Sequence, residues 1–265
     1  MLGGLTNVNV ELTSRCNKSC HMCGRRERER LNPEVLQSYG DMDFSKVEEI
    51  AAQLPPGIVV QLHNNGESML YPRFGEAVSL FSNQITNVVT NGRHLLRKFD
   101  EIVGRLSTMA VSIVEDDPEG EEQYEILAEF LDLKGGRSPH TIARLNGDVH
   151  AGPYEDLGLP IARRLLHAPG GSYDYSAPPT VPEIGVCLDF LGHLSIDRYG
   201  RVSQCVRYDP DGLGVIGYLG IGMTLDEIWN SEERMSRMRC HLEGRRADVP
   251  LCSGCHFWGV PTGRI

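Results

Sequence analysis

The stretch Cys16-Asn17-Lys18-Ser19-Cys20-His21-Met22-Cys23 contains three cysteines in the spacing C-x3-C-x2-C. Three thiolates this close together can hold three corners of a cubane iron–sulfur cluster, whose irons normally bind four thiolates. The fourth iron is then left to bind a ligand that is not protein. A structural zinc site fits less well, because such a site normally has four ligands in a closed tetrahedron. We therefore predict that Cys16, Cys20 and Cys23 bind an iron–sulfur cluster.

The composition is that of an ordinary globular protein. The chain has 265 residues, of which 40% are hydrophobic and 23% are charged, and this is ample for a sizeable core. Its net charge of −10 argues against a nucleic-acid partner, since nucleic-acid binders usually carry a basic face. The sequence has no apolar run of about twenty residues, so we expect no membrane partner. Eight cysteines without a signal peptide indicate metal binding in a cytoplasmic protein rather than disulfides.

Apolar strands and amphipathic helices alternate through the first part of the chain. Helices are expected from a capping box at Ser45 to Glu48, over 74–81, over 95–106 and after Pro118. The run from Arg25 to Arg30 is expected to be an exposed helical face, although its first arginines could contact a cofactor or a substrate. Alternation of this kind implies a parallel sheet with right-handed crossovers, and therefore the α/β class. The strands are expected near residues 7–12, 58–62, 85–90, 108–114, 141–145 and 164–166.

Three later segments, together with the cysteine motif, resemble the radical S-adenosylmethionine (SAM) superfamily. Residues 63–68, His-Asn-Asn-Gly-Glu-Ser, are similar to the Gly-Gly-Glu segment of that family, with Asn65 in place of the first glycine. Thr90-Asn91-Gly92 is similar to its third-strand Thr-Asn-Gly, and Ser112 is similar to a serine of its fourth strand. Each of these residues also has an ordinary structural interpretation when it is considered alone. Glu67 could be a helix-capping or solvated carboxylate, Asn91-Gly92 a turn, and Ser112 a strand residue. Their order and spacing carry the resemblance.

The resemblance implies a partial (β/α)6 TIM-like barrel, open rather than closed, with its site at the carboxyl ends of the strands. It also implies a [4Fe-4S] cluster that binds SAM. Arg144, on the fifth strand, could meet the SAM carboxylate or pair with a core acid. The residues assigned in this way to SAM are Met22, Asn65, Gly66, Glu67, Asn91, Ser112 and Arg144.

A second set of four cysteines lies in the last third of the chain. The first two flank a predicted hairpin, with strands over 191–196 and 201–206, and the last two form a C-x2-C hook. On spacing alone, such a set could hold zinc or a cubane cluster. A further cysteine, Cys240, is expected to be a buried thiol in a helix, or else a substitute ligand. The four are Cys187, Cys205, Cys252 and Cys255.

The hairpin and the hook resemble the twitch domain, the short form of the SPASM domain that follows the radical SAM barrel in a large subfamily. Full SPASM domains carry more cysteines and a second auxiliary cluster, so the resemblance implies one auxiliary [4Fe-4S] cluster here. It divides the chain into a radical SAM barrel over 1–168, a linker over 169–186 and a twitch domain over 187–265. In that domain, the hairpin and a helix surround the cluster. The linker is expected to close over the barrel mouth.

The two sites together imply a radical SAM oxidoreductase or maturase. Such an enzyme cleaves SAM reductively to a 5′-deoxyadenosyl radical, which abstracts hydrogen from a substrate. An auxiliary cluster with four thiolates would accept an electron, completing a two-electron oxidation or a crosslink. An external flavodoxin- or ferredoxin-like donor would supply the first electron. No side chain is assigned to catalysis.

The substrate is left open between a peptide and a small polar molecule. The short segment before the first strand favours a small substrate or a short peptide, because it cannot form a peptide-binding domain. One alternative is a small-molecule dehydrogenase that acts on an aminocyclitol-like or sugar-alcohol-like compound. The other is a non-catalytic zinc-binding protein.

Overall fold

The computed structural model describes residues 2–164, 187–206, 209, 211–253 and 255. In this part of the chain the strands form one sheet, in the order β6-β5-β4-β3-β2-β1-β7-β8-β9. From β6 to β7 the neighbouring strands are parallel, and β8 and β9 add antiparallel pairs. The strands are β1 (Asn7–Val10), β2 (Val59–Gln61), β3 (Ile85–Thr90), β4 (Thr108–Val114), β5 (His140–Asn146), β6 (Ile161–Arg164), β7 (His193–Ile196), β8 (Arg201–Ser203) and β9 (Val215–Tyr218).

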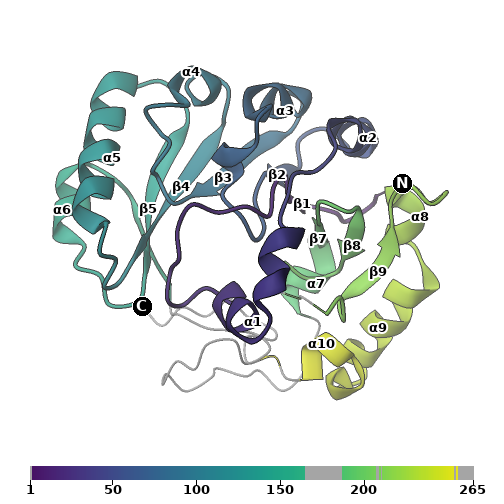
Figure 1. The fold of residues 1–265 in the computed structure, drawn as a ribbon. Coiled ribbons are helices and arrows are strands. Elements are labelled where there is room, and N and C mark those ends of the chain that lie inside the picture. Colours follow the sequence, from purple (N-terminus) through teal and green to yellow (C-terminus); the bar gives the residue numbers. More distant parts are fainter. Residues whose placement is uncertain (1, 165–186, 207–208, 210, 254, 256–265) are drawn as a thin grey trace.

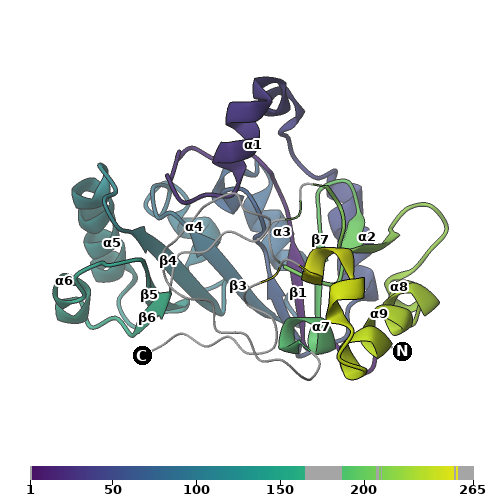
Figure 2. The same cartoon turned by 90° about the horizontal axis from the view of Figure 1, so that it is seen from below.

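Helices cover the outer side of the curved sheet. Figure 1 shows α2 to α6 outside the arc of strands, whereas α1, which follows the cysteine loop, projects beyond the ends of the strands in Figure 2. Seen from below, α8 and α9 lie at the end of the molecule opposite α5 and α6 (Figure 2). The arrangement is an open, partial barrel, as the sequence predicted. The helices are α1 (Arg25–Leu31), α2 (Phe44–Gln53), α3 (Phe74–Leu80), α4 (Phe99–Ile102), α5 (Gly120–Lys134), α6 (Gly152–Asp156), α7 (Leu188–Gly192), α8 (Leu225–Trp229), α9 (Glu232–Leu242) and α10 (Pro250–Ser253).

The two faces of the sheet differ in chemistry, because successive side chains of a strand point to opposite faces. In β1, Val8 and Val10 are fully buried in the hydrophobic core. Asn9 points to the other face, where its side chain donates a hydrogen bond to the carbonyl of His63 at 3.0 Å. Its carboxamide oxygen lies 2.9 Å from Nε2 of His193 on β7. The inner face is therefore polar at this point, and Glu11 extends that polar side to the end of β1.

The C-terminal hairpin continues the barrel sheet. β7 pairs in parallel with β1, from Asn7 opposite His193 to Val10 opposite Ile196. β8 then pairs antiparallel with β7, which confirms the predicted hairpin. The sequence did not indicate that this hairpin would join the barrel. The pairing covers an edge of β1 that an open barrel would otherwise leave with unpaired backbone groups.

Most of the predicted strands are confirmed. Those expected near residues 7–12, 58–62, 85–90, 108–114 and 141–145 are β1 to β5. The sixth was placed too late, at 164–166, because β6 covers Ile161–Arg164. Its position follows from its pairing with β5, where Ala143 lies opposite Ile161 and Asn146 opposite Arg164.

Two helical expectations were wrong in detail. Helix α2 begins at Phe44, and its N-cap residue is Asp43, whose side chain makes no capping hydrogen bond. Ser45 therefore lies inside the helix, and Ser45 and Glu48 do not form a capping box. Within the stripe expected over 95–106, only α4 is helical and turns precede it. Three apolar side chains of that stripe are nevertheless buried and three pack half-buried against the core, which explains the helix-like pattern.

Helix α1 is not the exposed face that its charges suggested. Arg25 is only 4% exposed and Glu29 only 9%. The Arg25 guanidinium lies over the ring of Tyr39, 3.9 Å from its centroid, and its Nε is 3.5 Å from a Glu29 carboxylate oxygen. A run of charges predicts exposure only when no partner is within reach, and here Glu29 lies in the same helix while Tyr39 lies beyond it.

In the described part of the chain, no helix is long and apolar enough to cross a membrane. The linker expected over 169–186 lies outside the described residues, so its position over the barrel mouth stays a prediction. The domain boundaries at 168 and 186 likewise stay predictions.

Candidate functional site

Three loops meet at the carboxyl ends of β1, β2 and β3. The cysteine loop follows β1, and the carbonyl of its Arg15 accepts a hydrogen bond from the backbone N–H of Glu67 at 2.8 Å. Farther along the loop, Oδ1 of Asn17 accepts a hydrogen bond from Nδ2 of Asn91 at 2.8 Å. The segments after β2 and β3 that resemble SAM-binding segments therefore both contact the cysteine loop.

Gly66 sits where a side chain cannot fit. A Cβ atom at this position would lie 2.1 Å from the carbonyl oxygen of Thr13 and 2.7 Å from that of Arg15. The backbone of the loop after β2 thus lies directly against the start of the cysteine loop. This is a close-approach glycine, for which any larger residue would displace the backbone.

Glu67 is a buried carboxylate, only 2% exposed. One oxygen accepts hydrogen bonds from the backbone N–H of Met69 at 3.2 Å and from Oγ1 of Thr90 at 2.9 Å. The other accepts from the backbone N–H of Asn91 at 2.8 Å. Burial raises the pKa of Glu67, and these three hydrogen bonds oppose the rise because they favour the ionised form. The side chain thus fastens the loop after β2 to the loop after β3.

The three cysteines of the motif lie close enough to affect one another electrostatically. Burial raises the pKa of Cys20 to about 11, and the charges of Cys23 and Cys16 add to the rise. Burial also raises the pKa of Cys16, against a hydrogen bond from the Lys18 backbone and the charge of Arg25. A metal or cluster reverses this cost, because it binds thiolates and displaces their protons. Three mutually close thiols with cationic neighbours fit an anionic iron–sulfur cluster, and of these Cys16 is exposed whereas Cys20 and Cys23 are half-buried.

A single metal ion fits these residues less well. Within the described ranges, no three His, Cys, Asp or Glu side chains converge closely enough to hold one ion. A cubane cluster spreads its thiolates over several irons and so needs no such convergence. The donor set therefore favours the cluster over zinc.

Lys18, inside the cysteine loop, anchors that loop to the end of β4. Its Nζ lies 2.5 Å from Oδ2 of Asp117, and the two side chains are 4% and 10% exposed. A cavity of about 330 Å³ lies beside this ion pair, lined by the cysteine loop and the segment after β4. Its walls include Cys20 and His21 on one side and Pro118 on the other. Met22 is half-buried in the same loop but does not line this cavity.

Ser112 and Arg144 lie on adjacent strands and are direct partners in the β4–β5 register. Gln123 of α5 ties this part of the sheet to the loop after β3, because its Nε2 donates to the carbonyls of Ser112 at 2.9 Å and Asn91 at 2.6 Å. Arg144 also lies near His63, whose pKa falls to about 3 through burial first and the charges of Arg144 and Arg164 second. Ser112 and Arg144 alternate with core residues of their strands and therefore lie on the inner face of the sheet. Whether they contact SAM stays a prediction.

Three of the auxiliary cysteines form a second group. Burial raises the pKa of Cys252 to about 12, and the charges of Cys255 and Cys187 add to the rise. Arg246 contacts the C-x2-C segment, because its Nη1 donates hydrogen bonds to the carbonyls of Cys252 at 3.0 Å and Cys255 at 2.8 Å. The fourth predicted ligand, Cys205, lines a larger cavity described next. Cys240 lies in α9, as predicted, but it is half-buried rather than buried.

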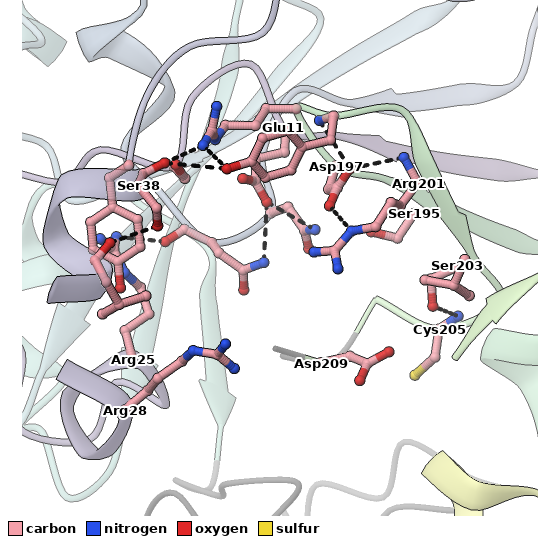
Figure 3. Close-up of a pocket in the computed structure, with 18 residues that line it drawn as sticks. Glu11, Arg25, Arg28, Ser38, Ser195, Asp197, Arg201, Ser203, Cys205 and Asp209 are labelled. Carbon is pink, nitrogen blue, oxygen red and sulfur yellow. Dashed lines mark hydrogen bonds and ion pairs between the residues drawn. The ribbon is translucent and has the colours of Figure 1, made fainter. Parts of the chain in front are cut away.

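The larger cavity, about 350 Å³, lies between the end of β1, helix α1 and the C-terminal hairpin (Figure 3). Glu11 and Ser14 line it from the first strand and its loop, and Asn65 from the loop after β2. Its other side comes from the hairpin and the chain after it, including Asp197 and Cys205. Further lining residues are Arg25, Arg28, Arg198, Arg201 and Asp209.

Sequence reasoning did not find the charged residues of this cavity. Glu11 had a usable signal, because it alternates with the apolar Val10 and Leu12 and so must face away from the core. Asp197 and Arg201 had none, since their place beside β1 depends on the unforeseen pairing of β7. Arg25 was taken for part of an exposed face.

Comparisons with known proteins agree with this arrangement. Residues 187–256 match the SPASM family, an iron–sulfur cluster-binding domain. No curated protein matches the chain. Among solved structures, the chain is similar to BtrN in complex with AdoMet and 2-DOIA, with a TM-score of 0.62 and 17% identity, over 95% of this chain and 92% of that one.

Two further structures are similar to the chain. Native anSMEcpe with bound AdoMet has a TM-score of 0.64 and 14% identity, over 97% of this chain and 92% of that one. Streptococcus suis SuiB bound to S-adenosylmethionine has a TM-score of 0.50 and 11% identity, over 96% of this chain and 72% of that one. At such identities the likeness concerns the fold.

The partial barrel places the chain in the α/β class, and residues 187–256 match an iron–sulfur cluster-binding domain. More particularly, the chain has the fold of the radical SAM enzymes of the SPASM/twitch type, and its C-terminal part is a SPASM domain. The fold that the resemblance implied is therefore confirmed, and the SPASM match over 187–256 agrees with the twitch-like region expected there. A non-catalytic zinc-binding protein is not supported.

Proposed function

We propose that this protein is a radical SAM oxidoreductase with one auxiliary [4Fe-4S] cluster. One observation carries the proposal: the cysteine loop is hydrogen-bonded both to Glu67 after β2 and to Asn91 after β3. A cofactor bound at the cysteines would therefore adjoin both segments that resemble SAM-binding segments. The AdoMet in the BtrN and anSMEcpe structures supports this assignment.

Each predicted ligand has a distinct role in the proposal. Cys16, Cys20 and Cys23 would hold the first cluster, and the cluster with SAM would supply a 5′-deoxyadenosyl radical. The loop at Asn65 and Gly66 would receive the methionine end of SAM through its backbone. Glu67 would fix that loop, and its ionised oxygens would add to the attraction for the SAM ammonium. Met22, Asn91, Ser112 and Arg144 would line the rest of the cofactor site.

The auxiliary cluster would be held by Cys187, Cys205, Cys252 and Cys255. With four thiolates it would bind no substrate, and its part would be to accept one electron. The overall reaction would be a two-electron oxidation or a crosslink of a peptide or a small polar molecule. The larger cavity, at about 350 Å³, lies at the lower end of the range for ligand pockets and favours a small molecule or a single side chain. The proposal includes a cytoplasmic location and a flavodoxin- or ferredoxin-like donor.

The test is metal and product analysis of the anaerobically reconstituted protein. Two cubane clusters give about eight irons and about eight sulfides per chain. With a strong reductant and SAM, the protein should release 5′-deoxyadenosine. Replacing Cys16, Cys20 and Cys23 together with alanine should remove about half of the iron and all of the 5′-deoxyadenosine. Replacing Cys240 with alanine is the matched control and should change neither.

Two results would contradict the proposal. One is zinc at about two ions per chain with no sulfide, which would indicate two zinc sites. The other is 5′-deoxyadenosine formation that survives in the triple cysteine variant.

A further inference from the structure

Glu11 occupies a position between the two cysteine groups. It follows β1 on the inner, polar side of the sheet and is 4% exposed. It lines the larger cavity together with Ser14, at the start of the cysteine loop, and Cys205, a predicted auxiliary ligand. A molecule bound in this cavity would therefore lie between the loop of the first cluster and a ligand of the second.

In the part of the chain that the structure describes, the Glu11 carboxylate accepts its hydrogen bonds from neutral carboxamides. Oε2 accepts from Nδ2 of Asn65 at 3.2 Å and from Nδ2 of Asn64 at 3.4 Å. Among the described residues, no cationic group forms an ion pair with it. The other carboxylates of the cavity are engaged differently: Asp197 pairs with Arg201 at 2.5 Å, and Asp209 accepts two backbone hydrogen bonds.

The surroundings of Glu11 raise the pKa of its carboxyl group towards neutral pH. Burial, with a contribution from the charge of Asp197, raises the pKa of Glu11 to about 7. The hydrogen bond from Asn65 and the more distant charges of Arg198 and Arg25 lower it only in part. A carboxylate with a pKa near the working pH can both take up and release a proton, which is the property of a general base.

We propose that this cavity is the substrate site and that Glu11 is its general base. The inference rests on the proposed function and adds the residue and the kind of substrate. In the oxidation of a carbinol or amine carbon, the substrate loses a hydrogen atom to the 5′-deoxyadenosyl radical and one electron to the oxidised auxiliary cluster. The proton of its O–H or N–H group goes to the Glu11 carboxylate. A C=O or C=N bond forms, and Glu11 becomes the neutral acid.

The cavity also restricts the substrate. Its volume of about 350 Å³ suits a compact molecule or one side chain, and its walls carry guanidinium, carboxylate and carboxamide groups. Such walls bind a molecule with several hydroxyl or amino groups better than an apolar one, because each buried polar group requires a partner. The substrate class is therefore a small alcohol or amine rich in polar groups, or one hydroxyl- or amino-bearing side chain.

The first test measures the protonation of Glu11 in the reconstituted holoenzyme. Infrared difference spectra between pH 5 and 9, with glutamate labelled with carbon-13, report the protonated carboxyl group. We expect one buried glutamic acid with a midpoint near pH 7, absent in Glu11→Gln. It should remain in Glu76→Gln, the control, since Glu76 is exposed and the hydrogen bond from Arg73 lowers its pKa. A midpoint below pH 5, or a signal that survives in Glu11→Gln, would overturn the proposal.

The second test asks whether a molecule in the cavity can reach the carboxyl group. A small apolar carbodiimide adds to a protonated carboxyl group and rearranges to a stable N-acylurea, which peptide mass spectrometry locates. We expect label on Glu11 at pH 6, at least tenfold less at pH 9, and none on Glu76. Absence of label on Glu11 at pH 6 would show that the cavity does not give access to it and would reject the assignment.

The two proposals fail separately. A protein that forms no 5′-deoxyadenosine but shows the Glu11 titration and label would reject the proposed function and leave an ionisable cavity without that chemistry. A protein that cleaves SAM but shows no neutral-range titration at Glu11 would reject only the general base.

Discussion

The carboxylate of Glu67 accepts a hydrogen bond from the backbone N–H of Asn91 at 2.8 Å, and so joins the loop after β2 to the loop after β3. Both loops also contact the cysteine loop, through Arg15 and Asn17. One buried acid thus connects the segments that are predicted to surround SAM. Its effect on cofactor binding would follow from this connection as well as from its charge.

Glu67→Gln should weaken SAM binding by about tenfold or more while leaving the first cluster in place. A glutamine keeps one acceptor but turns an amide N–H₂ toward donors that now lack a partner, at a cost of about 1.5–3 kcal/mol for a charge-assisted hydrogen bond. Equilibrium dialysis with SAM and the visible spectrum of the cluster measure the two effects. Glu76→Gln, on the exposed side of α3, is the control. Unchanged SAM affinity in Glu67→Gln would contradict the assignment.

Gly66→Ala should disrupt the cysteine loop. Its Cβ would lie 2.1 Å from the Thr13 carbonyl oxygen, and backbone cannot move aside as a flexible side chain can. We expect a loss of roughly 3 kcal/mol or more in the free energy of unfolding, together with loss of iron from the first cluster. Gly120→Ala is the matched control, because Gly120 opens α5 with open space around its Cβ position. Equal iron content and stability in the two variants would show that the close approach has no consequence.

Much of the fold could be predicted from the sequence, because each strand is specified by a local pattern of residues. β3 and β4 were predicted with their observed bounds, since each is a short apolar run between turns. The pairing of β7 with β1 was not, because it joins residues far apart in the chain through backbone groups that leave no side-chain pattern. Burial of Arg25 was missed for a related reason: its partner Tyr39 lies beyond the helix.

The candidate site divides in the same way. The cysteines and Gly66 could be found from spacing, because cluster ligation and close backbone approach each demand one residue type. The charged walls of the larger cavity could not, because an arginine or aspartate on a turn usually faces water. Only the three-dimensional position of Glu11, near two carboxamides and the half-buried Asp197, makes it differ from other strand-end acids.

Lys18→Met should destabilise the protein by about 3–5 kcal/mol, because it leaves Asp117 buried without its cation. The double variant Lys18→Met, Asp117→Leu should recover much of the loss, since it removes both charges. Urea denaturation measures both effects. Arg73→Ala breaks an exposed pair with Glu76 and serves as the control, with a change below about 1 kcal/mol. A double variant no more stable than the single one would mean that Lys18 acts through another contact.

The variants Cys205→Ala and Cys240→Ala should differ sharply in their iron content. Cys205 is the predicted fourth auxiliary ligand, and its loss should lower the iron content by about half while SAM cleavage continues. Cys240 lies on α9 and should be replaceable without loss of iron. Iron analysis and 5′-deoxyadenosine assays on the two variants decide between them. The reverse pattern would make Cys240 the ligand and would place an open cysteine in the larger cavity.

Compared with the wild type, the Glu11→Gln variant should become more stable as the pH rises. Because burial raises the pKa of Glu11 from 4.5 to about 7, the folded protein keeps its proton over a range in which the unfolded chain has released it. Wild-type stability therefore falls as the pH rises from about 4.5 to about 7 and is constant with respect to this group outside that range. At about 1.4 kcal/mol per pKa unit, the loss reaches at most roughly 3.5 kcal/mol. Because glutamine cannot ionise, the variant does not show this pH-dependent loss of stability. Urea denaturation of both proteins at pH 5 and pH 8 should show the advantage of the variant growing with pH, whereas Glu76→Gln should show no such growth. A pH-independent difference between wild type and Glu11→Gln would mean that Glu11 is ionised throughout, as an acid in contact with water would be.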